Sequence, residues 1–173
     1  MKPIVVIVCG LPGSGKSYFG SKLAKKIRAA YLNSDRLRKK LFEKSEYSEK
    51  EKFTVYEEML RRSKRTLKRN KSVVLDATFY KADIRGKFVE EFKDKKQIFI
   101  IEVRADRRIT RKRLNQPRPY SDANAKIYDK IERQWESIPE KHLMLQSTNI
   151  NINAMLVKAT RYLNTGNVSR TSR

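Results

Sequence analysis

The stretch Gly10-Leu11-Pro12-Gly13-Ser14-Gly15-Lys16-Ser17 satisfies the pattern G-x-x-x-x-G-K-[ST] without a mismatch. It follows residues 4–9, an apolar and β-branched run that is typical of a strand buried on both faces. It precedes a segment in which Phe19, Leu23 and Ile27 recur at helical spacing. A strand, a glycine-rich loop and a helix in this order predict a phosphate-binding loop.

This loop supplies several kinds of phosphate contact. Its glycines let the backbone curl so that N–H groups converge on phosphate oxygens, and the helix N-terminus adds partial positive charge. Lys16 is expected to reach the β- and γ-phosphates, and Ser17 is expected to hold Mg²⁺. ATP is the expected donor, with other nucleoside triphosphates left open. The predicted nucleotide-binding residues are Gly10, Leu11, Pro12, Gly13, Ser14, Gly15, Lys16, Ser17 and Tyr18.

Apolar runs and amphipathic segments alternate along the rest of the chain, which predicts a parallel sheet covered by helices on both faces. The predicted fold class is an α/β P-loop NTPase fold with about five parallel strands. Ser34 or Asp35 is expected to cap the N-terminus of the helix that carries Leu37. Ser121 or Asp122 is expected to cap the N-terminus of the helix that carries Ile127. Further strands are expected at 29–33, 72–78, 97–103 and 148–153, and further helices at 48–69, 81–93 and 105–114. Another helix is expected from 121 or 122 to about 138, with Ile127, Ile131, Trp135 and Ile138 on one side. The last helix is expected after 153, through Met155, Leu156, Ala159 and Leu163.

The predicted helix at 48–69 has two faces of different character. Its apolar residues Phe53, Tyr56, Leu60 and Leu67 are expected to point inward. Basic residues crowd its second half, which fits either a solvated face that suits the helix dipole or a contact face for nucleic acid. Those basic residues are Arg61, Arg62, Lys64, Arg65, Lys68, Arg69 and Lys71.

The length and composition limit the number of domains and the kind of partner. With 173 residues the chain fits one domain, predicted at 1–165, followed by a flexible basic tail at 166–173. A formal charge of +22, from 41 Lys and Arg against 19 Asp and Glu, favours a polyanionic partner. The apolar opening is too short to span a bilayer, so no membrane contact and a cytoplasmic location are expected. Cys9 is expected to be a buried thiol, and the oligomeric state is left open.

Ligands of open parallel sheets bind beyond the carboxyl ends of the strands, so residues just after each strand are candidates for chemistry. Asp35 is the predicted general base that accepts the proton of an attacking hydroxyl, with a helix cap as its alternative role. Arg38, one turn further, is the predicted clamp for an anionic group of the acceptor. Asp76 is predicted to assist Mg²⁺ or to orient Asp35, and Thr78 to contact the acceptor.

An arginine-rich segment follows the fourth predicted strand and is interrupted by two prolines. Arg113 and Arg118 bracket this interruption and predict a mobile lid that closes on ATP and screens the transferring phosphate. Several neighbouring arginines leave the individual assignment open. His142 is the lone histidine and is expected to be structural or exposed.

These residues together resemble the polynucleotide-kinase-like branch of the P-loop kinases, an AAA-type family of ATP-binding kinases. The resemblance rests on residues 13–17, on Asp35-Arg36-Leu37-Arg38, on Asp76-Ala77-Thr78 and on the arginines at 113–118. It implies that Asp35 activates the 5′-hydroxyl end of RNA or DNA and that Arg38 holds the adjacent phosphate. The family usually has Asn where this chain has Phe79.

Three functions are compatible with this reading. The leading hypothesis is a kinase that transfers the γ-phosphate of ATP to the 5′-hydroxyl end of a nucleic acid. The first alternative is a kinase for a small metabolite such as a sugar, nucleoside or antibiotic, because related kinases share this frame. The second is an ATP-dependent nucleic-acid-binding protein without a phosphoacceptor other than water.

Overall fold

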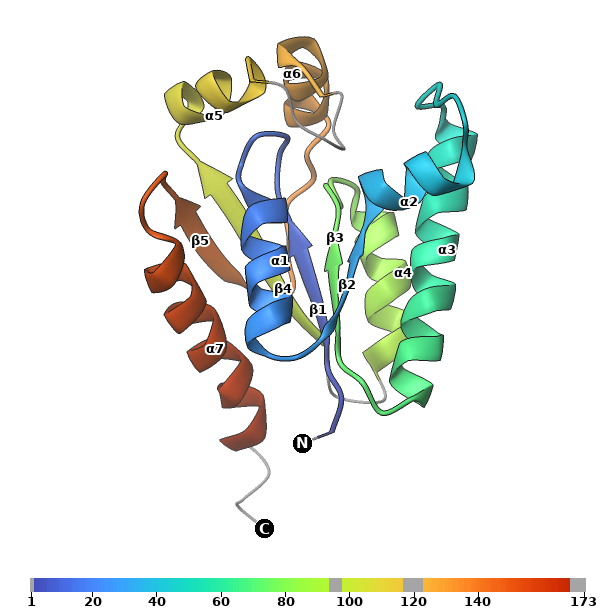
Figure 1. Ribbon diagram of the computed structural model, residues 1–173, viewed down its shortest axis with the longest axis vertical. Helices are drawn as coiled ribbons and strands as arrows, with labels where there is room; N and C mark the ends of the chain where they lie inside the picture. Colours follow the sequence, from blue (N-terminus) through green and yellow to red (C-terminus); the bar gives the residue numbers. More distant parts are fainter. Residues whose placement is uncertain (1, 94–97, 117–122, 169–173) are drawn as a thin grey trace.

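The computed structural model describes residues 2–93, 98–116 and 123–168, and these residues contain one sheet of five parallel strands (Figure 1). The central strand β1 (Val5–Cys9) is buried along its whole length, as its continuous apolar sequence predicts. The strand order is β2-β3-β1-β4-β5, which confirms the predicted α/β architecture. The other strands are β2 (Ala30–Asn33), β3 (Val73–Asp76), β4 (Ile98–Ala105) and β5 (Leu143–Ser147).

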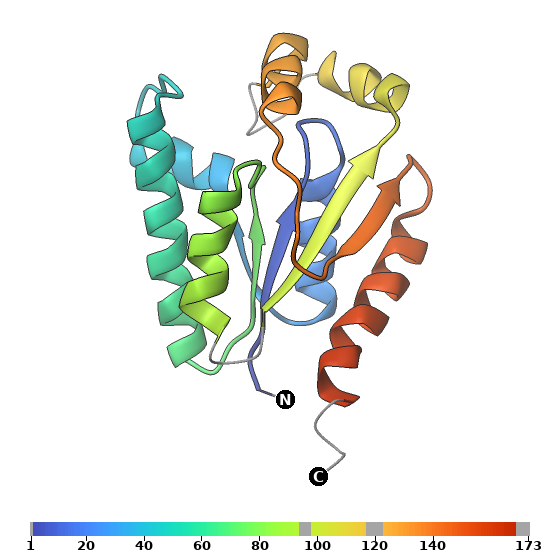
Figure 2. The ribbon, with the colours of Figure 1, turned by 180° about the vertical axis from the view of Figure 1, so that it is seen from behind.

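Helices cover both faces of the sheet (Figures 1 and 2). One face carries α1 (Lys16–Lys26) and α7 (Ile152–Val168), and the other carries α3 (Glu49–Lys68) and α4 (Ala82–Phe92). Beyond the carboxyl ends of the strands lie α5 (Arg107–Leu114) and α6 (Ala125–Arg133), while α2 (Ser34–Leu41) packs beside α3. Within the described residues, no helix has the length and hydropathy needed to cross a membrane.

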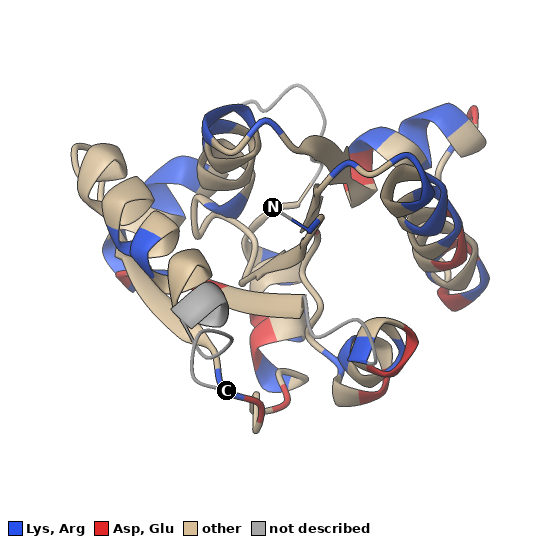
Figure 3. Cartoon of the chain, turned by 90° about the horizontal axis from the view of Figure 1, so that it is seen from below, with Lys and Arg blue, Asp and Glu red and all other residues tan. Residues whose placement is uncertain are grey.

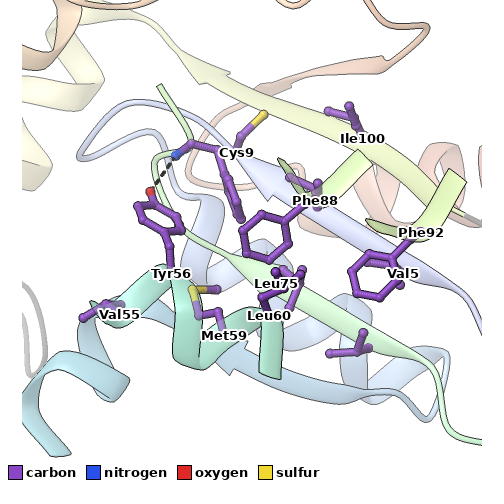
Figure 4. Packing of buried hydrophobic residues seen from close by; sticks show 14 of the residues in the cluster. Val5, Cys9, Val55, Tyr56, Met59, Leu60, Leu75, Phe88, Phe92 and Ile100 are labelled. Carbon is purple, nitrogen blue, oxygen red and sulfur yellow. Dashed lines mark hydrogen bonds between the residues drawn. The ribbon is translucent and has the colours of Figure 1, made fainter. Parts of the chain in front are cut away.

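The core on the α3 and α4 side is rich in aromatic rings (Figure 4). Tyr56, Phe79 and Phe88 form a triangle with ring centroids 5.2 to 6.3 Å apart. The N–H of Phe79 donates to the hydroxyl of Tyr56 over 3.3 Å. Phe79 has a φ of 48° and is fully buried, so this residue fills the core beneath the β3–α4 loop. The Asn of the resembled family is therefore replaced here by a packing residue.

Arg85 is a buried cation that the apolar pattern of its helix does not reveal. Its Nη1 donates to the carbonyl of Phe79 over 2.7 Å, and its Nη2 donates to the carbonyls of Glu136 and Ser137 over 3.0 and 2.5 Å. These bonds join the β3–α4 loop to the segment after α6. Because this segment is fastened to the core, Trp135 and Ile138 pack on the core although α6 already ends at Arg133.

The predicted helix at 48–69 is confirmed, but its buried face is shifted. Ser48 caps it by accepting a hydrogen bond from the N–H of Glu51. Phe53, expected to point inward, is 63% exposed, while Val55 and Met59 are completely buried. The helix faces the core with the stripe through Val55, Tyr56 and Met59, because the rings of α4 and the β3–α4 loop lie on that side.

The predicted strand at 148–153 is wrong. The last strand is β5, residues 148–151 form a loop in which Ile150 is 92% exposed, and residues 152 and 153 already belong to α7. Asn151 organises this loop, because its Oδ1 accepts from the N–H of Thr148 and its Nδ2 donates to the carbonyl of Gln146. Local side-chain bonding of this kind competes with a sheet ladder.

Two further boundaries differ from expectation. Asn124 caps α6 by accepting from the N–H of Ile127 over 3.1 Å, and the expected caps Ser121 and Asp122 lie outside the described residues. Helix α7 continues to Val168 and so includes the first three residues of the predicted tail. Residues 169–173 lie outside the described part of the chain.

Candidate active site

The loop at residues 10–17 connects β1 to α1 at the carboxyl edge of the sheet (Figure 1). Gly13 and Gly15 have φ values of 77° and 93°, in the left-handed region that favours glycine. A Cβ on Gly13 would lie 2.9 Å from Thr110 Cγ2, and one on Gly15 would lie 2.7 Å from Ser147 Oγ. The loop is therefore closely enclosed by α5 and by the end of β5.

A cavity of about 600 Å³ opens beside this loop. One wall is the first turn of α1, whose N–H groups have no partner within the helix. A second wall comes from β2 and the start of α2, and a third from the end of α5 and the β5–α7 loop. Its principal lining residues are Gly15, Lys16, Ser17, Tyr18, Tyr31, Asn33, Asp35, Arg36, Arg113, Gln116, Ser147, Thr148, Asn149, Ile152 and Met155.

Lys16 and Ser17 stand where the motif predicts. Lys16 lines the cavity, and its Nζ donates to the carbonyl of Leu11 over 3.5 Å, so the cation rests on its own loop. Ser17 is exposed to the cavity, while its carbonyl accepts from the hydroxyl of Tyr31 over 3.2 Å. A cation and an accessible hydroxyl next to a helix N-terminus suit a polyphosphate and its ion. Gly10, Leu11, Pro12 and Ser14 complete the loop.

Asp76 is completely buried at the end of β3. Its Oδ2 accepts hydrogen bonds from the Tyr31 hydroxyl over 2.5 Å and from Asn33 Nδ2 over 2.6 Å. Its Oδ1 has no hydrogen-bond partner among the described residues. Burial and the adjacent Asp76 carboxylate raise the pKa of Tyr31, so its hydroxyl remains a donor. One carboxylate oxygen is thus fixed, while the other is buried without a partner in the described part of the chain, and Asp76 itself is not among the residues that line the cavity.

The β2 residues Tyr31 and Asn33 were missed by the sequence reasoning. They are two positions apart on one strand, so their side chains point to the same face and both reach Asp76. Asn33 also caps α2, because its Oδ1 accepts from the N–H of Arg36 over 2.9 Å. The expectation that Ser34 or Asp35 caps this helix is therefore wrong.

Asp35 lies in the first turn of α2 and lines the cavity on the side opposite β5, with Arg36 beside it. Arg36 places its guanidinium 5.5 Å from the ring centre of Tyr31. The α2 wall of the cavity therefore includes an acidic and a basic residue, and Lys16 lines the same cavity. A carboxylate can take a proton from a hydroxyl, and a guanidinium can attract an anionic group.

Arg38 does not line this cavity. It is 7% exposed, its Nη1 lies 3.6 Å from Glu51 Oε2, and its guanidinium stacks 4.8 Å from the ring centre of Tyr47. Glu51 also accepts from Ser45 Oγ and from the N–H groups of Glu46 and Tyr47, over 2.8 to 2.9 Å. Burial under the α2–α3 loop thus separates Arg38 from the cavity that contains Asp35.

Thr78 lies beyond β3 and also does not line the cavity. Its carbonyl accepts from the N–H of Gly10 over 3.3 Å, which links the β3 end to the phosphate-binding loop. Its side chain lies near the hydroxyl of Tyr56. These contacts position the loop, and a contact between Thr78 and an acceptor stays a prediction.

Arg113 is the described member of the predicted lid pair, and Arg118 lies outside the described residues. Its Nη1 donates to the carbonyls of Gly13 and Ser14 over 3.2 and 3.1 Å. The same guanidinium contacts Ser147 Oγ at 3.3 Å and Asn149 Oδ1 at 3.1 Å. Burial lowers the pKa of Arg113 relative to its usual value. In this structure Arg113 joins α5, the phosphate-binding loop and the β5–α7 loop.

The fold and this site define a P-loop protein of the kinase-like α/β class. The chain belongs to the AAA domain family, whose match spans residues 5–139. A sequence comparison with curated proteins gives no significant match.

Solved structures share the fold at low sequence identity. A gluconokinase from Sinorhizobium meliloti 1021 superposes with a TM-score of 0.75 at 16% identity, covering 99% of both chains. The Mycobacterium tuberculosis APS kinase CysC, solved with AMPPNP and APS, gives 0.73 at 16% identity, covering 94% of this chain and 98% of the other. Chaetomium thermophilum Kti12 with ADP-AlF3 gives 0.69 at 18%, covering 92% and 98%. The polynucleotide-kinase-like subtype finds no support among these neighbours.

Proposed function

We propose that this chain is an ATP- and Mg²⁺-dependent phosphotransferase whose acceptor is a hydroxyl of a small anionic molecule. The observation that carries the proposal is that Lys16 of the phosphate-binding loop and Asp35 of α2 line the same cavity. A phosphate cradle alone serves hydrolases, switches and kinases alike. A carboxylate on the opposing wall adds a base for an acceptor hydroxyl, which favours transfer over hydrolysis.

The residues around the cradle fit ATP and its ion. The N–H groups at the start of α1 and the Nζ of Lys16 would hold the phosphates. Ser17 Oγ and, through water, the unpartnered Oδ1 of Asp76 would hold Mg²⁺, which supplies charge neutralisation for the transferring group. The amide and hydroxyl groups of Thr148 and Asn149, beside the apolar Ile152 and Met155, suit a purine ring.

On the acceptor side, Asp35 would accept the hydroxyl proton while Arg36 attracts an anionic group of the acceptor. Arg113 would keep the phosphate-binding loop in its receptive shape through the Gly13 and Ser14 carbonyls. The proton would then be removed from the attacking hydroxyl while the charge of the γ-phosphoryl group that it attacks is neutralised, as phosphoryl transfer requires. A small acceptor is supported by the gluconokinase and APS kinase among the structural neighbours.

The 5′-hydroxyl end of a nucleic acid is the second candidate acceptor. The observation in its favour is the charge of +22. The burial of Arg38 against Glu51 counts against it, because the strand phosphate that Arg38 would hold cannot reach it without movement of the α2–α3 loop.

One experiment separates the candidates. The protein is incubated with γ-labelled ATP, Mg²⁺ and a panel of sugars, sugar acids, nucleosides, aminoglycosides and 5′-hydroxyl oligonucleotides. We expect label on a small compound and no more than background label on the oligonucleotides. Label on oligonucleotides alone would select the second candidate, and release of inorganic phosphate with no labelled acceptor would reject both.

A further inference from the structure

A group of basic side chains lies at the end of the sheet opposite the candidate active site. Figure 3 views the molecule from this end, with Lys and Arg along the ends of α1 and α3 on either side of the N-terminus. No Asp or Glu occurs at residues 1–34 or 59–75, the two stretches that supply these turns. We call this group the basic edge. It comprises the exposed residues Lys2, Lys25, Lys26, Arg28, Lys68, Arg69 and Lys71.

Hydrogen bonds between the turns place these residues side by side. The N–H of Ala30 donates to the carbonyl of Ser72 over 2.8 Å, and the N–H of Ile4 donates to Ser72 Oγ over 3.1 Å. The turns before β2, β3 and β1 therefore adjoin, in the order of the strands. Since neighbouring strands are about 4.8 Å apart, the basic edge is a continuous row about 10 Å wide between its outer strands.

The basic edge differs in its ion pairing from the basic residues in the middle of α3. Arg61 and Arg62 pair with Glu58, and Lys64 pairs with Glu91. In the part of the chain that the structure describes, no residue of the basic edge pairs with a carboxylate within 4.0 Å. Solvated helix faces usually interleave both signs of charge, so the mid-helix residues fit that description and the basic edge does not.

Compensation of the helix dipoles does not account for the whole edge. Both helices end in a Schellman motif: Ala29 N–H donates to Ala24 O over 2.9 Å, and Lys71 N–H donates to Thr66 O over 3.2 Å. These bonds already satisfy terminal carbonyls. The residue of the first motif that adopts a left-handed conformation is Arg28, with a φ of 54°, where glycine is favoured. An arginine at this position has a local conformational cost, which a contact made by its side chain would offset.

We propose that the basic edge binds the phosphate backbone of a nucleic acid, without reading its sequence. Unpaired cations in a row attract a polyanion through counterion release. The large apolar residues that are exposed in the described chain all lie elsewhere, so the edge lacks aromatic platforms for bases and apolar anchors for a membrane. The whole sheet separates this edge from Lys16, so nucleic acid held here is a bound partner, not the phosphoacceptor. The inference is thus independent of the proposed function.

The test uses a fluorescein-labelled, 5′-phosphorylated single-stranded RNA of 20 nucleotides, which offers no 5′-hydroxyl to phosphorylate. Anisotropy titrations at several salt concentrations compare three proteins. The edge variant carries Lys25→Gln, Arg28→Gly and Lys71→Gln. The control variant carries Lys40→Gln, Lys126→Gln and Arg133→Gln, which remove the same charge at exposed positions on α2 and α6.

We expect the edge variant to bind at least tenfold more weakly and to lose about 2 from the slope of log K against log salt, since each lost phosphate contact removes about 0.7. The control variant should stay within about threefold of wild type. The Arg28→Gly change should not lower Tm, because glycine suits that φ. Equal losses in both variants, no RNA binding by the wild type, or binding to anionic phosphatidylserine vesicles in preference to RNA would each overturn the proposal. ATP binding, followed with a fluorescent nucleotide, should be unchanged in the edge variant.

Discussion

The guanidinium of Arg38 lies 3.6 Å from the carboxylate of Glu51, and both side chains are buried beneath the α2–α3 loop. Glu51 serves at the same time as acceptor for two backbone N–H groups and one hydroxyl of that loop. Among the described residues, Arg38 Nε and Nη1 have no hydrogen-bond partner. Glu51 therefore holds the α2–α3 loop over Arg38, and not all hydrogen-bond donors of Arg38 are used.

Replacing Glu51 by Gln tests this fastening. The amide keeps the size but loses the charge and one acceptor oxygen, so Arg38 is left buried without a counterion. We expect Tm to fall by roughly several degrees and the amides of Glu46 and Tyr47 to exchange hydrogen at least tenfold faster. The matched control is Glu49→Gln, whose side chain is 83% exposed and pairs with Lys52 at the surface. Unchanged exchange in Glu51→Gln would show that the loop is held by other contacts.

The same carboxylate gives a pH dependence with a definite sign. Hydrogen bonds from the Glu46 backbone, and the nearby Arg38, hold the pKa of Glu51 below its ordinary value. A depressed pKa means that the stabilisation is present above the ordinary pKa and is lost as the pH falls through the folded-state value. Protection of the Glu46 and Tyr47 amides should therefore be constant near neutral pH and decline in acid. In Glu51→Gln the decline should be absent, and an identical acid decline in both proteins would contradict this assignment.

Asp76→Asn separates a role in catalysis from a role in folding. The variant keeps an acceptor for Tyr31 and Asn33 but removes the charge that we assign to Mg²⁺. We expect kcat/KM to fall roughly 100-fold or more and the Mg²⁺ requirement to rise, with Tm changed by only a few degrees. Asp83→Asn, an exposed change in the first turn of α4, is the control. A large loss of Tm with normal Mg²⁺ dependence in the folded fraction would make Asp76 structural.

Arg113→Met tests whether this arginine braces the phosphate-binding loop. Without the guanidinium, the Gly13 and Ser14 carbonyls lose their donor and the loop becomes less ordered. We expect the Kd for ATP, measured by calorimetry, to rise about tenfold, consistent with the loss of a charged hydrogen bond. Arg111→Met on the exposed side of α5 should leave it unchanged. A fall in kcat at constant Kd would instead indicate that Arg113 contacts the transferring phosphate, as its predicted lid role requires.

Cys9 should be unreactive in the folded protein. Burial and the nearby Glu102 carboxylate raise the pKa of its thiol to about 12. At pH 8 the thiolate fraction is then about 10⁻⁴, far below that of a free cysteine. We expect no reaction with a disulfide reagent at pH 8 until denaturant is added, followed by one equivalent. Rapid labelling of the native protein would contradict the burial of the β1 end.

Much of the fold follows from local patterns in the sequence. β1, the loop at 10–17, α1 and α3 are predictable because apolar runs, glycines and a serine cap act through neighbouring residues. The last strand is not predictable in this way, because Asn151 bonds to Thr148 and Gln146 and α7 begins at Ile152, and only the pairing with β4 identifies β5 as the edge strand.

The candidate site is likewise predictable from the sequence only in part. The positions of Lys16, Ser17 and Asp35 around the cavity are predictable from the motif and from the rule that ligands bind at the carboxyl edge. The hydrogen-bond partners of Asp76 are not predictable in this way, because Tyr31 and Asn33 meet Asp76 only through the pairing of β2 with β3. Arg38 illustrates the same limit, since its burial depends on Glu51 from another helix.

The most direct test of the proposed phosphotransfer compares the fate of γ-labelled phosphate in wild type and in Asp35→Asn, with ATP affinity measured on the same samples. The account predicts that the wild type transfers label to a small hydroxyl compound. Asp35→Asn should transfer it at least about 100-fold more slowly, with a Kd for ATP within about threefold of wild type, because a general base acts on the acceptor and not on the nucleotide. A wild type that releases only inorganic phosphate, or an Asp35→Asn variant that transfers at the wild-type rate, would contradict it.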